Sequence, residues 1–359
     1  MTFPKALRRP ACPHPPPRLA REAMAPNPAY PDGILPRESL LSLIDSGAVT
    51  GAQEARVQPA SLDLTLGDRA VRVRASFLPG EGASIASTLD SLALHEIPLD
   101  GGAVLETGCV YLIPLREGLS LPPTLEGLAN PKSSTGRLDV FTRVICDGAV
   151  RFDAVAPGYR GPLWVEVAPR TFPILARTGD ALVQLRLRAG PAAATHTQTV
   201  SIDLSGSLHD DGRVGYRARR HSGLVDLSGV GAHAARDYWD PLYAPGGELV
   251  LDPDEFYILA SAEAVSIPHD QAAEMAPIAP EIGEFRAHYA GFFDPGFGLG
   301  QQARAVLEVR GRDVPFLLRH GQPVARLVFE PMSAPPATAY GQGGNYQGQG
   351  LKLGKHFRD

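Results

Sequence analysis

A short polar segment combines two cations, three hydroxyls and a glycine in six residues, Lys132-Ser133-Ser134-Thr135-Gly136-Arg137. Hydroxyl and backbone N–H groups can donate to phosphate oxygens, and a guanidinium can bind two oxygens at once. The segment lacks the GxxxxGK[ST] spacing of a Walker A loop. Its composition therefore indicates a polyphosphate site of another kind, although a solvated loop can have the same composition.

Two glutamates stand among apolar residues of the strand-forming type, Glu166 in LWVEV and Glu308 in AVLEV. A carboxylate in such a position is costly unless it has partners. One interpretation is a salt-bridged residue at the rim of a barrel. The other is a general base, whose pKa is raised because burial disfavours the charged form.

The C-terminal segment 338–357 is rich in glycine and carries groups that can stack or form hydrogen bonds, among them Tyr340, Tyr346 and Gln349. Such a segment can close over a bound ligand as a lid. Glycine content alone would equally indicate a frayed terminus.

The composition of the 359-residue chain limits the fold classes and the kinds of partner that we expect. Hydrophobic residues make up 44% and charged residues 20%, as in globular proteins, while 38 glycines and 34 prolines favour an all-β chain with many turns. The net charge of -5, without a long basic run, argues against a nucleic-acid polymer as partner. No apolar run approaches the ~20 residues that span a bilayer. Three widely spaced cysteines are typical of a reduced, cytoplasmic protein.

An internal repeat organises the chain. Residues 165–187 align without a gap with residues 307–329, which places Glu166 on Glu308 and Arg177 on Arg319. Alternating apolar residues and intervening turn residues predict short strands in both copies.

From this repeat we expect two β units, at 30–195 and 216–359, joined by a polar linker at 196–215. One short helix is expected at 37–47, where apolar residues recur at helical spacing before a glycine. Residues 1–29, rich in Pro and Arg, are expected to be a disordered leader; alternatively Met24 is the true start and residues 1–23 do not belong to the protein.

Taken together, these features resemble the metal-free dCTP deaminases, relatives of the trimeric dUTP pyrophosphatases. The family's phosphate element, RSSxxR, is similar to KSSTGR at 132–137, with Lys132 in place of the first arginine. Its hairpin, IDPGW…VLE, is similar to FDPGF at 293–297 and VLE at 306–308, and more loosely to 152–166. Its C-terminal element is similar to FEPMSAPPATAYGQGGNYQGQ at 329–349, and an early strand with an aspartate is similar to QPASLDLTLG at 58–67.

The resemblance covers 30–190 and 246–359. It implies an all-β fold of two tandem, distorted dUTPase-like β-barrels with few short helices. It also implies an enzyme that hydrolyses dCTP to dUTP and ammonia, and so supplies dUTP for thymidylate synthesis. The HxE and PCxxC elements that hold zinc in nucleoside deaminases are missing from the sequence, so no zinc or other metal ligand is expected. Mg²⁺ is expected only as the companion of the substrate triphosphate.

The resemblance also implies a role for each part of the site. Glu308, or alternatively Glu166, would move the protons. Ser133 would hold the attacking water, and Arg137 would neutralise phosphates and orient that serine. The other substrate contacts would come from Lys132, Ser134, Thr135, Gly136, Asp153, Asp294, Val306, Tyr340, Tyr346 and Gln349.

The two copies differ where the site is built. Aligning Ser120-Leu121-Pro122 with Ser266-Ile267-Pro268 places KSSTGR opposite IAPEIG at 278–283, so the second copy lacks both serines and the arginine. The YQGQ element stands only at the end of the second copy. Because sites of this family lie between neighbouring barrels, we expect the first copy to bind the triphosphate and the second to supply hairpin, glutamate and lid.

Two other functions stay open. The dUTP pyrophosphatases use an aspartate in the hairpin and an RGxxGFGSTG-type tail; the YQGQG tail here favours deamination, while Asp153 and Asp294 keep open a bifunctional enzyme that forms dUMP. A non-catalytic nucleotide-binding regulator is the other alternative, against which Ser133, Arg137 and a strand glutamate argue. A homo-oligomer built from triads of barrels, and regulation by dTTP or dUTP, are also expected.

Overall fold

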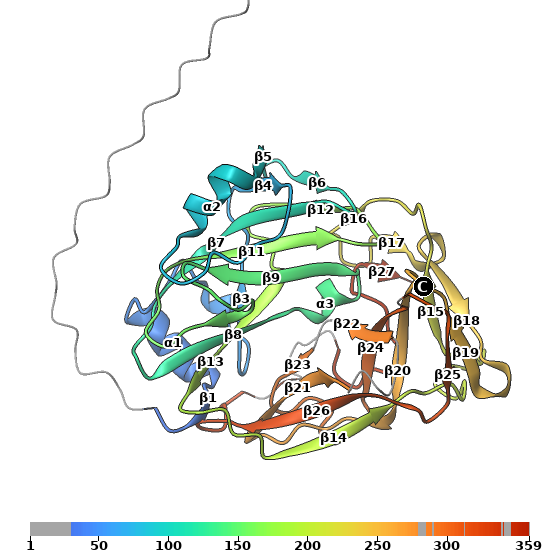
Figure 1. Ribbon diagram of the computed structural model, residues 1–359. Coiled ribbons are helices and arrows are strands. Elements are labelled where there is room, and N and C mark those ends of the chain that lie inside the picture. The colour runs from blue at the N-terminus through green and yellow to red at the C-terminus, as the bar shows by residue number, and fades with distance from the viewer. Residues whose placement is uncertain are drawn as a thin grey trace, which may run out of the picture.

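The computed structural model describes residues 30–278, 285–288, 291–311, 313–338, 340 and 346–358, and for 285–288 the backbone alone. Strands joined by turns dominate this part of the chain, and its helices are short (Figure 1). The all-β prediction is therefore confirmed. The leader predicted at 1–29 and residues 279–283, which align with the polar motif, lie outside the described residues.

The first β unit contains two larger sheets and a small one. A five-stranded sheet has the order β1-β13-β8-β10 with β3 also on β13: β1 (Gly33–Ile34), β3 (Leu62–Leu64), β8 (Leu125–Pro131), β10 (Ala154–Val155) and β13 (Val183–Ala189). A six-stranded sheet has the order β5-β4-β7-β11-β9 with β2 on β7: β2 (Val49–Thr50), β4 (Arg69–Val73), β5 (Ala93–Pro98), β7 (Val110–Ser120), β9 (Val140–Cys146) and β11 (Arg160–Pro169). The small sheet has the order β16-β12-β6: β6 (Ala103–Leu105), β12 (Ile174–Ala176) and β16 (Val225–Asp226).

The second unit contains two larger sheets and two small ones. A four-stranded sheet has the order β14-β26-β21-β23: β14 (His196–Ser201), β21 (Gln271–Pro277), β23 (Phe292–Phe293) and β26 (Pro323–Pro331). A five-stranded sheet has the order β18-β15-β20-β24-β22: β15 (Gly215–Ala218), β18 (Trp239–Leu242), β20 (Phe256–Ala264), β22 (Phe285–His288) and β24 (Arg304–Gly311). Two strand pairs complete the unit: β17 (His233–Ala234) with β27 (Phe357–Arg358), and β19 (Glu248–Leu251) with β25 (Phe316–Arg319).

The strand pairings of the first unit recur in the second. The neighbours β7-β11-β9 repeat as β20-β24-β22, β13-β8-β10 repeat as β26-β21-β23, and β12-β6 repeat as β25-β19. Glu166 in β11 and Glu308 in β24 occupy the same place, each with a paired strand on both sides. The repeat predicted from the sequence is thus present in the strand topology.

Residues 196–215 were predicted to be a linker, but the structure contains a strand at the start of this range. Its first residues form β14, which pairs antiparallel with β26 just as β1 pairs with β13. The strand is hidden in the sequence because Val200 is its single buried side chain, and the polar residues around it read as a loop. The second unit therefore begins ahead of residue 216.

The helices of the described residues are few and short. The helix predicted at 37–47 is confirmed: it buries Leu40 and Leu43 and ends just before Gly47, whose φ is 74°. The second helix was not predicted; the hydroxyl of Ser84 accepts a hydrogen bond from the backbone N–H of Ser87 at its start. None of the described helices is long and apolar enough to cross a membrane. The helices are α1 (Arg37–Asp45), α2 (Ile85–Leu92), α3 (Ser133–Gly136) and the 3₁₀ turns η1 (Glu54–Arg56), η2 (Ala235–Asp237) and η3 (Pro245–Gly247).

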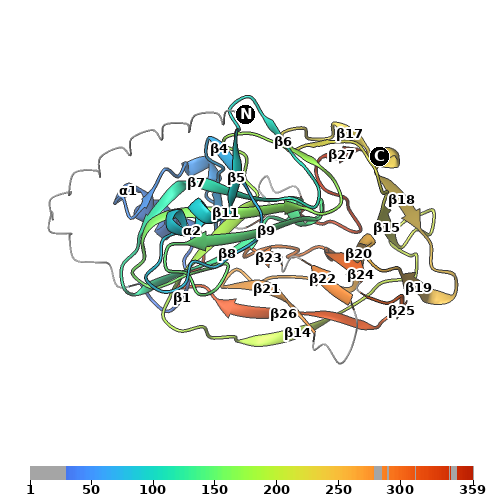
Figure 2. The same cartoon turned by 45° about the horizontal axis from the view of Figure 1, so that its top comes forward.

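The two units pack against each other (Figure 2), and both apolar and charged side chains contact one another at the junction where the units meet. Trp239 of the second unit meets Phe172 of the first edge-on, with ring centroids 5.3 Å apart. An ion pair of 2.9 Å joins Arg188 in β13 to Glu330 in β26. The aromatic contact is buried and the ion pair is partly buried, so both contribute to the packing of the two units.

Candidate active site

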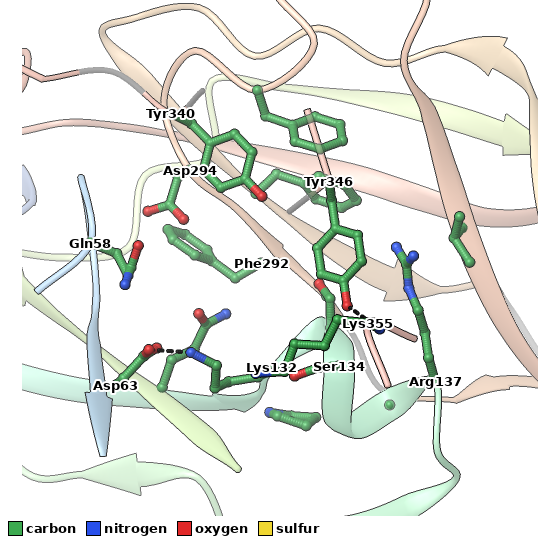
Figure 3. Close-up of a pocket in the computed structure, with 18 of the residues that line it drawn as sticks. Gln58, Asp63, Lys132, Ser134, Arg137, Phe292, Asp294, Tyr340, Tyr346 and Lys355 are labelled. Atoms are coloured by element: carbon green, nitrogen blue, oxygen red, sulfur yellow. Dashed lines mark hydrogen bonds and ion pairs between the residues drawn. The ribbon is translucent and has the colours of Figure 1, made fainter. Parts of the chain in front are cut away.

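A cavity of about 560 Å³ lies at this junction and is lined by both units (Figure 3). The first unit contributes the polar motif and residues between 53 and 63, and the second contributes residues 291–297, β24 and the C-terminal tail. One chain therefore brings together most of the residues predicted for the site, namely Lys132, Ser133, Ser134, Gly136, Arg137, Asp294, Val306, Glu308, Tyr340, Tyr346 and Gln349.

The polar motif forms the short helix α3, which follows β8 directly. Ser133 and Ser134 line the cavity. Thr135 is different, because it is buried and its hydroxyl donates to the carbonyl of Leu182 at 2.7 Å. Thr135 thus anchors the helix to the chain ahead of β13 and does not line the cavity, contrary to its predicted contact with substrate.

Cations gather around the start of this helix. Lys132 forms an ion pair with Asp63 of β3, a buried residue. Lys355 from the tail also lines the cavity, and its pKa is lowered by burial and by the nearby charges of Lys132 and Arg56. A positive charge that the protein balances only in part suits a polyanionic ligand.

Arg137 is held in place by the tail. It is 2% exposed, and it donates through Nη1 to the carbonyl of Lys352 at 2.9 Å and through Nη2 to Oε1 of Gln349 at 2.8 Å. Its Cζ lies 4.0 Å from the centroid of the Tyr346 ring. Tyr346 and Gln349, the residues of the tail element YQGQ that line the cavity, therefore both contact Arg137.

The tail is packed more firmly than its glycines indicated. Leu351 and Leu353 belong to the hydrophobic core that both units share, and His356 is 2% exposed. The last strand of the tail, β27, pairs with β17. Apolar side chains between the glycines thus anchor 346–358, while residues 341–345 lie outside the described part, and closure of the tail as a lid stays a prediction.

Glu308 lies in the middle of β24 and is 6% exposed. Its Oε1 is 3.9 Å from Nε of Arg137, which reaches it from the other unit. Burial raises the pKa of this carboxyl to about 8, against the opposing effect of the Arg137 charge. A carboxyl that titrates near neutral pH can both accept and donate protons, as a general acid–base group must.

Asp294 and Tyr340 form another wall. Asp294 is 7% exposed, its Oδ1 accepts the N–H of Ala60 at 3.0 Å, and burial raises its pKa to about 7. Tyr340 donates its backbone N–H to the carbonyl of Pro295 at 2.9 Å, and its ring packs 5.6 Å from that of Phe297. Burial raises the pKa of Tyr340 to about 12, so its hydroxyl is a donor at neutral pH.

Glu166 and Asp153 do not line this cavity. Glu166 is buried in the first unit, where burial raises its pKa and Ser76 and Arg143 lower it. Asp153 forms a 3.1 Å ion pair with Arg143 and accepts the N–H of Val144 at 2.8 Å, and burial raises its pKa to about 6. The structure places both residues in the first unit's counterpart of the hairpin, apart from the polar motif.

Several lining residues were not singled out from the sequence. They include Gln53, Arg56, Gln184, Met275 and Phe292. They come from η1, from strands and from turns that meet only in the folded chain, so no local spacing marks them. Asp63 could be found through the similarity of 58–67 to a family strand, and Lys355 through its place in the tail.

Among the described residues, no group of three or more His, Cys, Asp or Glu side chains is arranged to hold a metal ion. The cavity is instead lined by cations, hydroxyls, amides and separate carboxyls.

A duplicated β fold with a hydroxyl-rich cationic turn facing a buried glutamate across the junction is the architecture of a nucleotide-binding, dUTPase-like protein. Family models for the 2'-deoxycytidine 5'-triphosphate deaminase (DCD) N-terminal and C-terminal domains match residues 31–191 and 180–357. A crystal structure of 2'-deoxycytidine 5'-triphosphate deaminase from Agrobacterium tumefaciens is similar, with a TM-score of 0.81 and 49% identity over 85% of this chain and 97% of that chain. The chain belongs to the dCTP deaminase family, as the sequence resemblance indicated.

Shorter similarities connect the chain to curated members of the family. The "dCTP deaminase, dUMP-forming" of Corynebacterium efficiens is 34% identical over 112 residues, and that of Kocuria rhizophila is 37% identical over 112 residues. Each match covers 30% of this chain and 56% of the relative. The chain thus spans little more than half the length of the curated relatives it matches.

Proposed function

We propose that this protein hydrolyses dCTP to dUTP and ammonia, with Glu308 as the general acid and base. The observation that carries the proposal is the position of Glu308, buried in a cavity that also contains the polar motif and 3.9 Å from Arg137. The dUTP formed would serve thymidylate synthesis.

The reaction needs one group that moves protons between water and the cytosine ring. Water adds to C4 while the Glu308 carboxylate takes one of its protons and delivers it to N3. The carboxylate then takes the remaining proton of the new hydroxyl and delivers it to the amino group. Ammonia leaves, the C4 carbonyl forms, and Glu308 is again ionised. A pKa of about 8 suits both halves of this cycle.

The other lining residues would hold substrate. Lys132, Ser134, Gly136 and Arg137 would bind the triphosphate together with its Mg²⁺, while Ser133 would hold the attacking water. Asp294 would accept a hydrogen bond from the sugar. Contacts to base or phosphates would come from Val306, Tyr340, Tyr346 and Gln349.

Formation of dUMP is the second candidate, because the matched relatives from Corynebacterium efficiens and Kocuria rhizophila carry that description. Those relatives match 30% of the chain, whereas the Agrobacterium tumefaciens deaminase matches 85% of it. The longer match supports simple deamination as the main proposal.

Product analysis tests these functions. Purified protein is incubated with dCTP and Mg²⁺, and separately with dUTP, and the released ammonia and pyrophosphate are measured independently. We expect one ammonia per dCTP consumed, dUTP as product, and no pyrophosphate from either nucleotide. Pyrophosphate with dUMP would establish the bifunctional reaction. Binding of dCTP without either product would leave a nucleotide-binding regulator.

The proposal also covers where the enzyme acts, how it is regulated and how it assembles. A small nucleotide is its substrate, and the cytoplasm is where the free nucleotides of this reaction occur. Regulation by dTTP or dUTP would act at the same cavity, since both share the triphosphate of dCTP. A homo-oligomer of barrel triads would place further copies around the junction described above.

A further inference from the structure

Two ion pairs of opposite polarity connect the same two segments across the junction. Glu308 in β24 faces Arg137 just after α3, and Arg310 in β24 pairs with Asp139 in the same loop. The second pair is displaced from the first by two residues in both segments, from Glu308 to Arg310 in β24 and from Arg137 to Asp139 in the loop. In β24 this spacing places Glu308 and Arg310 on one face of the strand.

Additional hydrogen bonds support the second pair. Asp139 is 0% exposed and accepts, through Oδ2, the hydroxyl proton of Thr171 at 2.6 Å. Nη2 of Arg310 donates to Asp139 and to Thr171 Oγ1, the latter at 3.0 Å, and Nη1 donates to the carbonyl of Asp254. We call Arg310, Asp139 and Thr171 the Arg310 clasp.

The clasp acts on the loop that carries Arg137. The backbone N–H of Asp139 donates to the carbonyl of Gly136 at 2.9 Å, and its carbonyl accepts the N–H of Arg170 at 3.0 Å. The φ of Asp139 is 54°, a left-handed conformation that needs such support. None of the three clasp residues lines the cavity, so we expect none of them to contact the substrate.

We propose that Arg310 is a positioning residue for the reaction: through Asp139 and Thr171 it holds the Arg137 loop against β24 and so sets the distance between Arg137 and Glu308. This inference rests on the proposed function of Glu308. It adds a residue outside the cavity whose role is to keep two site residues from different units in register.

The clasp has an electrostatic consequence. Arg137 is the charged side chain that lowers the pKa of Glu308, while burial in β24, the strand between β20 and β22, raises it. The tail presents Tyr346 and Gln349 to the same cavity. If the loop moves away, Arg137 stabilises the carboxylate less, and the pKa of Glu308 rises further.

The experiment is a pH profile of kcat and KM for dCTP with wild type and Arg310→Lys. Because Glu308 must be ionised to take the first proton, we expect the acid limb of kcat to move to higher pH, with kcat at neutral pH down about 10- to 100-fold. Glu330→Gln is the matched control, since it also weakens a partly buried ion pair across the junction, at 2.9 Å from Arg188 but away from the cavity. Its acid limb should stay where the wild type has it.

Thr171→Val is a milder second variant, which keeps both charges and removes the hydroxyl between them. It should shift the limb in the same direction by less. If Arg310→Lys or, where that variant does not fold, Thr171→Val lowers kcat equally at every pH, the clasp is a general structural contact and the proposal fails. An inactive wild type would instead overturn the proposed function, and the role of the clasp with it.

Discussion

The guanidinium of Arg137 lies over the ring of Tyr346, with Cζ 4.0 Å from the ring centroid. The two residues belong to different units, and the tail also supplies the carbonyl of Lys352 and the amide oxygen of Gln349 to the same guanidinium. The tail therefore orients the main cation of the proposed triphosphate site before any ligand binds, which lowers the entropic cost of binding.

Replacing Tyr346 with leucine tests this relationship. A cation–π contact of this kind contributes roughly 0.5–2 kcal/mol, so we expect the KM for dCTP to rise about 3- to 30-fold, with a smaller change in kcat. Tyr346→Phe is the control, because it keeps the ring and removes only the hydroxyl that accepts the N–H of Lys355 at 3.3 Å. Steady-state kinetics of both variants test this prediction. An equal rise in KM for both variants would show that the contact of the ring with Arg137 is not responsible.

Glu308→Gln should abolish most of the turnover and leave binding intact. The amide is close to the carboxyl in size but cannot take a proton from water, so kcat should fall by roughly 10²–10⁴. Glu166→Gln offers a control at the equivalent position of the first unit, in a buried strand but outside the cavity. It should retain near wild-type kcat. Loss of activity in Glu166→Gln with survival of Glu308→Gln would reverse the assignment of the two units.

The raised pKa of Glu308 also predicts how stability depends on pH. Its folded-state pKa of about 8 lies above the ordinary value of 4.5, so the folded protein holds this proton more tightly than the unfolded chain does. The stability gained from this group is complete below pH 4.5 and is lost as the pH rises through about 8. Asp294, with a pKa of about 7, contributes with the same sign.

Urea unfolding of the ligand-free protein at a series of pH values between about 5 and 9 measures this effect. Glu308→Gln carries no titrating group at this position, so its free energy of unfolding should fall less steeply than that of wild type over this range. The variant should gain on wild type as the pH increases. A constant difference between the two proteins at all pH values would mean that Glu308 does not titrate there.

How much could be predicted from the sequence depended on whether a feature is local. The polar motif at 132–137, the glutamate of β24 and the repeat are contiguous patterns, and each was found from residue types and spacing. The Arg310 clasp was not, because Arg310 and Asp139 are 171 residues apart and meet only where the units join. Spacing within the short motif also does not reveal that the hydroxyl of Thr135 turns towards Leu182 while Ser133 and Ser134 line the cavity. The packing of the tail could not be predicted either, because its glycines indicate flexibility and the few leucines between them find their partners only in the folded chain.

The last prediction concerns which chain supplies each half of a site. Arg137 comes from the first unit and Glu308 from the second, yet within a single chain they lie 3.9 Å apart around one cavity. A chain with Arg137→Ala and another with Glu308→Gln should each be inactive. Co-expressed with different tags and purified through both tags in turn, the mixed assembly should stay inactive, because every cavity then contains one defect. If sites formed between chains, random mixing would leave about one quarter of them intact, and activity would return to a comparable level. A mixture of two wild-type chains with the same tags shows that co-purification itself does no harm, and recovery of activity in the double-variant assembly would overturn the single-chain site.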